Sequence, residues 1–157
     1  MPSAMRNSDK QYDTVTANIF SASLQIHRDL GPVLLESVYE AILERELLDR
    51  GFHVQRQQRV NITYRGHQYT EAFRADLVVE NWVVVEVKSI ARISAADTKQ
   101  LLSYLKLLGL PVGLLVNFGC ATLREGLKRM VHTPRPQEQR LSASAAQEGV
   151  TRAVHAP

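Results

Sequence analysis

Apolar residues dominate residues 73–89, F-R-A-D-L-V-V-E-N-W-V-V-V-E-V-K-S. A polar pair, Glu80–Asn81, divides this segment into two halves that are both rich in valine. Valine-rich runs separated by a short polar turn are typical of a β-hairpin with a buried face. The pattern predicts strands over Phe73–Val79 and Trp82–Lys88, and we expect the rest of the domain to be built around them.

Other segments have helical or alternating periodicity. The expected helices cover residues 13–30, 34–49, 94–108 and 122–131, and the expected strands cover residues 53–58, 59–64, 68–73 and 112–116. Asp13 or Thr14 would begin the first helix, and Arg65–Gly66 would form a hairpin turn. Ser94 would cap the third helix, with Asp97 as the acid of a capping box. The apolar run Val112–Val116 follows a helix, which favours a buried parallel strand reached by a right-handed crossover. This order predicts an α/β protein of the α+β type, with a mixed sheet flanked by helices.

The length of 157 residues is sufficient for one domain with tails. We expect a flexible N-terminus over residues 1–12, a folded domain over 13–132 and a disordered tail over 133–157. The single cysteine, Cys120, excludes an internal disulfide and a cysteine zinc cluster, and it fits a reducing, cytoplasmic compartment. No apolar run approaches the roughly 18 residues of a membrane span, so we expect no membrane partner.

The formal charge of +3 and pI of about 9.2 are compatible with nucleic-acid binding but do not require it. Several arginines could form a surface that faces phosphates, or they could be scattered charges that keep the protein soluble. Both interpretations stay open for Arg56, Arg59, Arg65, Arg74 and Arg92.

Asp76, Glu86 and Lys88 are charged residues within the valine-rich hairpin. Burying a charge costs about several kcal/mol unless the charge is paired or bound to a metal. Glu86 and Lys88 project from one face of their strand, and a tight turn places Asp76 beside Glu86 on the neighbouring strand. Two close carboxylates repel each other, and a hard divalent cation relieves the repulsion. A lysine beside such a cation can orient or help deprotonate a water, or stabilise charge on a phosphate.

An acid, an acid-x-lysine on a hairpin and a following helix with glutamine resemble the PD-(D/E)XK nuclease superfamily. The corresponding residues are Asp76, Glu86-Val87-Lys88 and Gln100. The usual proline before the first acid is replaced by Ala75. The resemblance implies a restriction-endonuclease-like core and a nuclease activity.

The segment G-P-V-L-L-E-S-V-Y-E at Gly31–Glu40 is similar to the GxxExxY family within this superfamily. Its E-x-x-Y part is present as Glu36 and Tyr39, whereas Val33 occupies the position of the usual glycine. H-R-D-L-G-P, F-R-A-D-L-V-V-E, Q-L-L-S-Y-L and G-L-L-V-N-F-G also resemble the family, and the match covers roughly residues 14–131. The resemblance implies that the first core helix supplies an additional acid, Glu36.

Together, these features predict metal-dependent hydrolysis of phosphodiester bonds in nucleic acid, with DNA favoured. The expected ligands of Mg²⁺ or Mn²⁺ are Glu36, Asp76, Glu86 and the backbone carbonyl of Val87. Lys88 would position water or balance charge, and Gln100 would orient the site. The residues expected to contact nucleic acid are Tyr39, Arg74, Arg92, Lys99 and Tyr104. Small nucleases of this fold often act as homodimers.

Two alternatives belong to other classes of function. In the first, the same fold is a nucleic-acid-binding or protein-interaction module that cleaves nothing, and such a module has no need of a divalent metal. In the second, Glu86 and Lys88 form a structural ion pair on the strand and Asp76 is a turn acid. Substituting the acids would then change stability but no activity.

Overall fold

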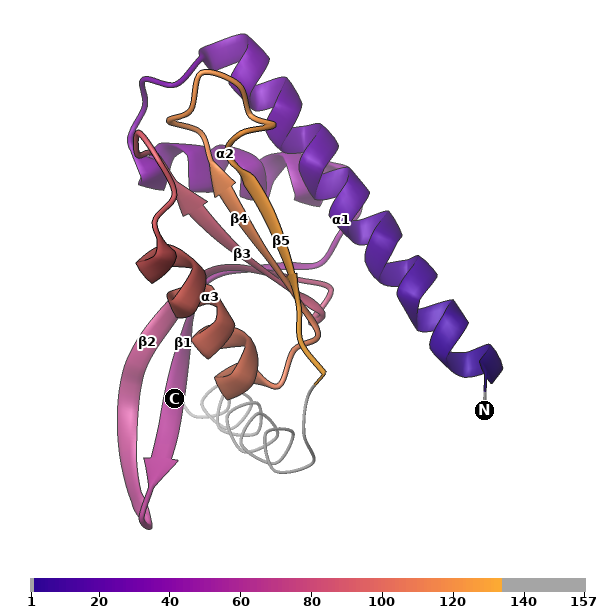
Figure 1. Cartoon of the computed structure of the whole chain (residues 1–157), viewed down its shortest axis with the longest axis vertical. Helices are drawn as coiled ribbons and strands as arrows, with labels where there is room; N and C mark the ends of the chain where they lie inside the picture. The colour runs from indigo at the N-terminus through magenta and orange to yellow at the C-terminus, as the bar shows by residue number, and fades with distance from the viewer. Residues whose placement is uncertain (1, 134–157) are drawn as a thin grey trace, which may run out of the picture.

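The computed structural model describes residues 2–133, with side chains from residue 9 onwards. Its core is a five-stranded mixed sheet in the order β1-β2-β3-β4-β5 (Figure 1). Helices α1 (Pro2–Leu30) and α2 (Glu36–Asp49) pack on one face, and α3 (Ala95–Leu108) packs on the other. The predicted architecture, a mixed sheet flanked by helices, is confirmed. The predicted tail lies outside the described residues, apart from its first residue.

Helix α1 is longer than the sequence pattern indicated. It begins at Pro2 rather than at Asp13 or Thr14, and it ends at Leu30 as expected. Proline suits the first helical position because its fixed φ is already helical and the missing N–H needs no partner there. The buried apolar residues of α1 recur at helical spacing: Val15, Ile19, Ala22 and Ile26. No helix within residues 2–133 is long and apolar enough to cross a membrane.

Strands β1 (Val54–Tyr64) and β2 (His67–Val79) form a long antiparallel hairpin. Each replaces two shorter strands of the prediction. The turn is at Arg65–Gly66 as expected, and both turn residues have a positive φ. Figure 1 shows that the far end of this hairpin extends beyond the rest of the described fold. The near end of β2 is buried in the sheet, whereas its first six residues are exposed.

Strand β3 (Val83–Lys88) pairs antiparallel with β2, which confirms the central hairpin. Glu80 and Asn81 have positive φ values of 54° and 57°, and the N–H of Trp82 donates a hydrogen bond of 3.0 Å to the carbonyl of Val79, as in a type I′ turn. The pair Val79↔Val83 leaves three residues between the strands. Helix α3 then begins at Ala95, and its N-cap Ser94 forms the predicted capping box with Asp97. Strand β4 (Val112–Asn117) returns parallel to β3, so the predicted crossover is also confirmed.

The helix expected over residues 122–131 is not formed. Residues 127–131 are instead strand β5 (Leu127–Val131), antiparallel to β4. The apolar residues Leu123, Leu127 and Val131 recur every four positions, which suits a helix as well as it suits a turn followed by a strand. Pairing with the edge of β4, which would otherwise have no partner strand, favours the strand over the helix.

Gly126 explains how the chain turns into β5. Its carbonyl accepts a hydrogen bond of 2.8 Å from the backbone N–H of Asn117. A Cβ at Gly126 would lie only 2.1 Å from the Asn117 carbonyl oxygen, so no larger residue fits there. This close approach of two backbones holds the turn against the end of β4.

Candidate active site

Glu86 and Lys88 lie on the face of β3 that points towards α3. The neighbouring residues Val85 and Val87 point the other way, into the core under α1 and α2. Glu86 is only 4% exposed, and Lys88 is half-buried. The alternation of the strand therefore places a carboxylate and an ammonium group side by side on one face, as predicted.

Asp76 lies on β2 opposite Glu86. The antiparallel register ends at the pair Leu77↔Val85, and one further step along both strands brings Asp76 across from Glu86. Beyond the pair Leu77↔Val85, the Asp76 side chain takes the place of a backbone hydrogen bond between the two strands. Its Oδ2 accepts a hydrogen bond of 2.9 Å from the N–H of Val87. The N–H and C=O of one strand residue point to the same neighbouring strand. The Val87 carbonyl is thus on the same side as Asp76.

The two carboxyl groups are held where their ionisation is unfavourable. Burial raises the pKa of Glu86 to about 8, and the negative charge of Asp76 adds to the rise. Burial likewise raises the pKa of Asp76, and the charge of Glu40 adds to that rise. Within residues 2–133, Glu86 Oε1 is buried without a hydrogen-bond partner. A carboxylate oxygen without a hydrogen-bond partner, beside a second carboxylate and a backbone carbonyl, suits a hard divalent cation.

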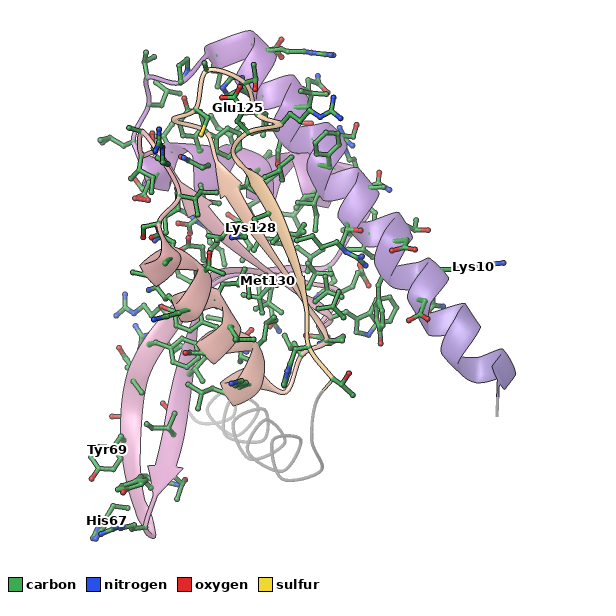
Figure 2. The ribbon with its side chains drawn as sticks, in the orientation of Figure 1. Lys10, His67, Tyr69, Glu125, Lys128 and Met130 are labelled. Atoms are coloured by element: carbon green, nitrogen blue, oxygen red, sulfur yellow. The ribbon has the colours of Figure 1, made fainter. Side chains whose placement is uncertain are left out.

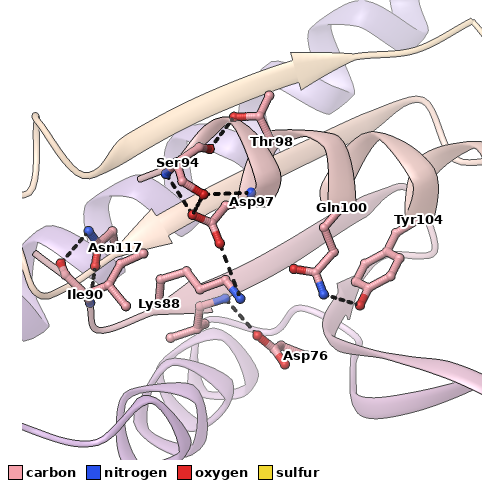
Figure 3. A network of polar contacts seen from close by, with 10 residues as sticks. Asp76, Lys88, Ile90, Ser94, Asp97, Thr98, Gln100, Tyr104 and Asn117 are labelled. Atoms are coloured by element: carbon pink, nitrogen blue, oxygen red, sulfur yellow. Dashed lines mark hydrogen bonds and ion pairs between the residues drawn. The ribbon is translucent and has the colours of Figure 1, made fainter. Parts of the chain in front are cut away.

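Lys88 lies between these acids and α3. Its Nζ is 4.0 Å from Oδ1 of Asp97, and its positive charge lowers the pKa of both Asp76 and Glu86 (Figure 3). Asp97 is fixed in turn by the helix cap, since its Oδ2 accepts a hydrogen bond of 2.7 Å from the N–H of Ser94. The capping box of α3 therefore also orients the lysine of the site.

Two further predicted residues reach the site from α3. Gln100 Nε2 donates a hydrogen bond of 2.7 Å to the hydroxyl of Tyr104 (Figure 3). The Tyr104 ring stacks on Phe73 of β2, with centroids 4.1 Å apart. Burial raises the pKa of Tyr104, and the charges of Glu86 and Asp76 add to the rise. The structure thus brings Gln100 and Tyr104 together with the two acids and Lys88.

Glu36 does not join Asp76 and Glu86 in a cluster of three acids. Among residues 2–133, no group of three or more histidine, cysteine, aspartate or glutamate side chains could hold a metal ion. The acid of α2 that faces the site is Glu40, one helical turn further on, and its charge acts on Asp76. Glu36 begins the same helix one turn earlier, and its role as a metal ligand stays a prediction.

Glu40 and Gln57 form a polar contact that the sequence analysis missed. Glu40 is 4% exposed and accepts hydrogen bonds from Arg56 Nε at 2.8 Å and from Gln57 Nε2 at 2.9 Å. The same Gln57 nitrogen lies 3.3 Å from Oδ1 of Asp76. Gln57 therefore links the carboxylate of α2 to the carboxylate of β2.

The backbone of Gln57 is unusual as well. It has a φ of 51° and lies opposite Asp76, between the pairs Arg56↔Leu77 and Gln58↔Ala75. A left-handed glutamine within a strand is uncommon, and such conformations cluster at functional sites. The only sequence signal was the polar run Q-R-Q-Q over residues 55–58, which does not indicate the conformation.

Tyr39 is not available for contact with nucleic acid. Its ring is fully buried and stacks on Phe118, with centroids 4.3 Å apart. Its hydroxyl donates a hydrogen bond to the carbonyl of Gly31 and accepts one from the N–H of Leu34 at 3.2 Å. Tyr39 therefore holds the loop between α1 and α2 against the core, and the predicted nucleic-acid contact is corrected.

The three predicted basic residues all lie on the surface. Arg74 belongs to β2, Arg92 to the loop before α3, and Lys99 to α3 itself. The loop that carries Arg92 is anchored by Asn117, whose Oδ1 accepts from the N–H of Ile90 at 3.0 Å and whose Nδ2 donates to its carbonyl at 2.8 Å. The exposure of the basic residues is compatible with phosphate contacts, which stay a prediction.

A mixed sheet with an acid on one strand and Glu-x-Lys on its antiparallel neighbour defines a restriction-endonuclease-like fold. A sequence model of the PD-(D/E)XK nuclease superfamily matches residues 13–130, so the chain belongs to this superfamily. No curated protein and no solved structure matches the chain significantly. The superfamily predicted from the motif is confirmed.

Proposed function

We propose that this protein is a divalent-metal-dependent nuclease that hydrolyses phosphodiester bonds, with DNA as the favoured substrate. Within the superfamily we assign it to the GxxExxY family, on its E-x-x-Y segment and the matching segments around it. The observation that carries the proposal is the pair of carboxylates formed by half-buried Asp76 and buried Glu86, with an oxygen of Glu86 left without a partner among the described residues. A purely structural ion pair gives no reason for the second carboxylate.

Asp76, Glu86 and the carbonyl of Val87 would hold Mg²⁺ or Mn²⁺. The bound cation supplies positive charge for the phosphate and makes a water more acidic. The protein contributes the rest: Lys88 positions that water or balances the negative charge that develops on the phosphate. Gln100 and Tyr104 orient the site from α3, while Arg74, Arg92 and Lys99 contact the nucleic acid.

In this proposal, Glu40 replaces Glu36 as the acid that α2 contributes to the site. It acts as a positioning residue through Gln57, which shares its side-chain nitrogen between Glu40 and Asp76. Substituting residues that orient metal ligands in this way costs about 10–100-fold in metal affinity.

The same proposal includes a cytoplasmic location, which fits the single reduced cysteine, and a homodimeric assembly.

Metal binding measured by calorimetry tests these assignments. We expect the wild-type protein to bind Mn²⁺, Asp76→Asn to lose binding, and Glu40→Gln to bind about 10–100-fold more weakly. Asparagine at position 76 can still accept the hydrogen bond from Val87, so the sheet is preserved. Glu36→Gln is the matched control on the same helix and is expected to bind like the wild type.

Two results would contradict the proposal. A folded wild-type protein that binds no divalent metal would favour a non-catalytic nucleic-acid-binding or interaction module on this fold. Weaker binding in Glu36→Gln with no change in Glu40→Gln would instead restore Glu36 as the acid of α2.

A further inference from the structure

The ribbon tip, which we define as residues 61–70, has one aromatic face. The pairs Ile62↔Tyr69 and Tyr64↔His67 are directly opposite each other across β1 and β2. Opposite residues share a face, and so do residues two apart on one strand. Ile62, Tyr64, His67 and Tyr69 therefore lie on one face, whereas Thr63 and Gln68 lie on the other.

The aromatic rings of this face are left open to solvent. Tyr64 is 58% exposed and Tyr69 is 50% exposed. Figure 2 shows Tyr69 and His67 at the far end of the hairpin, away from the helices. Nearer the sheet, Phe73 of the same hairpin is covered by Tyr104. Along β2, the exposed ring of Tyr69 is thus followed by the packed ring of Phe73.

The hairpin of β1 and β2 carries more positive than negative charge in and around the ribbon tip. Residues 59–74 contain Arg59, Arg65 and Arg74 against a single acid, Glu71. Arg59 and Arg74 both contact Glu71, at 2.7 and 3.1 Å. The guanidinium of Arg65 instead lies over the ring of Tyr64, 5.3 Å from its centroid. This combination of basic groups and open aromatic rings matches proteins that bind single-stranded nucleic acid.

Strand β2 connects the ribbon tip directly to the candidate active site. Tyr69 and Asp76 belong to the same strand, β2, seven residues apart. At about 3.4 Å per residue, seven residues span at most roughly 24 Å. A bulge in β2 shortens this path, since the five residues of β1 that run beside it span roughly 17 Å. A strand of nucleic acid that enters the site can therefore reach the ribbon tip several nucleotides from the cleaved bond.

We propose that the aromatic face of the ribbon tip binds unpaired bases of a single-stranded segment of the substrate. Tyr64 and Tyr69 stack on the bases, and Arg65 holds the adjacent phosphate. The choice of nucleic acid as the partner rests on the proposed function. The stacking face itself rests on the register, the exposure and the charge of the ribbon.

Binding of labelled oligonucleotides, followed by fluorescence anisotropy in chelator at fixed salt, tests this inference. The full chain is compared with Tyr64→Ser/Tyr69→Ser and with the matched control Thr63→Ser/Gln68→Ser on the opposite face. We expect the tyrosine variant to bind a thymidine single strand at least about tenfold more weakly, with duplex affinity unchanged. The control and Tyr64→Phe/Tyr69→Phe should bind like the wild type, because phenylalanine keeps the stacking face.

Three results would overturn the inference. The first is unchanged single-strand affinity in Tyr64→Ser/Tyr69→Ser, and the second is an equal loss for the duplex, since neither indicates stacking on unpaired bases. The third is a change from dimer to monomer in sedimentation, which would assign the aromatic face to a second copy of the chain. Binding is measured without metal and therefore does not depend on cleavage. If the protein were not a nuclease, binding that depends on Tyr64 and Tyr69 would still be observed.

Discussion

Lys88→Ala is expected to slow cleavage by about 10²–10³-fold at saturating substrate and metal. The Lys88 ammonium is the positive charge that acts on both Asp76 and Glu86, so its removal takes away stabilisation of the charge that develops during the reaction. The effect should fall on kcat rather than KM, because remote contacts with the nucleic acid are unchanged. Single-turnover cleavage rates measure it.

The fold should tolerate this substitution. Lys88 is half-buried, and its one ion-pair contact with the side chains of residues 9–133 is the 4.0 Å approach to Asp97, which keeps its own partner in Ser94. Lys106→Ala, in the last turn of α3, is the control and should cleave like the wild type. Wild-type cleavage by Lys88→Ala would remove Lys88 from the mechanism.

Glu86→Gln is expected to stabilise the metal-free protein at neutral and higher pH. The pKa of Glu86 is about 8 in the folded protein, against an ordinary value of 4.5. Between these values the folded state binds more protons than the unfolded state, so the stability of the wild type falls as the pH rises. Glutamine cannot ionise, and it resembles the protonated acid in shape. The gain in the free energy of unfolding should therefore grow from about pH 5 to about pH 8.

Urea denaturation in chelator at several pH values measures this difference. Glu125→Gln replaces an exposed acid and is the control, for which we expect little pH-dependent gain. A variant of Glu86 that is less stable than the wild type across the whole pH range would show that the carboxylate is a structural partner. The Glu86 carboxylate would then stabilise the fold, whereas a carboxylate retained to bind a cation should destabilise the metal-free protein.

Much of the fold was predictable because its signals are local. The valine-rich strands, the turn at Glu80–Asn81 and the capping box of α3 each depend on neighbouring residues, and all three were found. The same locality revealed Asp76, Glu86 and Lys88, since charges within a buried hairpin stand out against valine. Strand alternation then sufficed to place them together.

What could not be predicted depends on contacts between distant segments. Glu36 and Glu40 share one face of α2, and no local rule tells which of them reaches Asp76. Only the packing of α2 beside β1 selects Glu40, through a left-handed Gln57 that no sequence pattern indicated. Strand β5 escaped prediction for a similar reason, because its apolar spacing is also helical and the free edge of β4 decides its conformation.

The measurement that tests the nuclease proposal most directly is cleavage of labelled single- and double-stranded DNA and RNA by the wild-type chain. Each substrate is incubated with Mn²⁺ or Mg²⁺ and, in parallel, with chelator. The neighbouring carboxylates of Asp76 and Glu86 predict that at least one substrate, DNA before RNA, is cut with metal and remains whole in chelator. Equal cutting in chelator, or no cutting by folded protein that binds both metal and nucleic acid, would contradict the account.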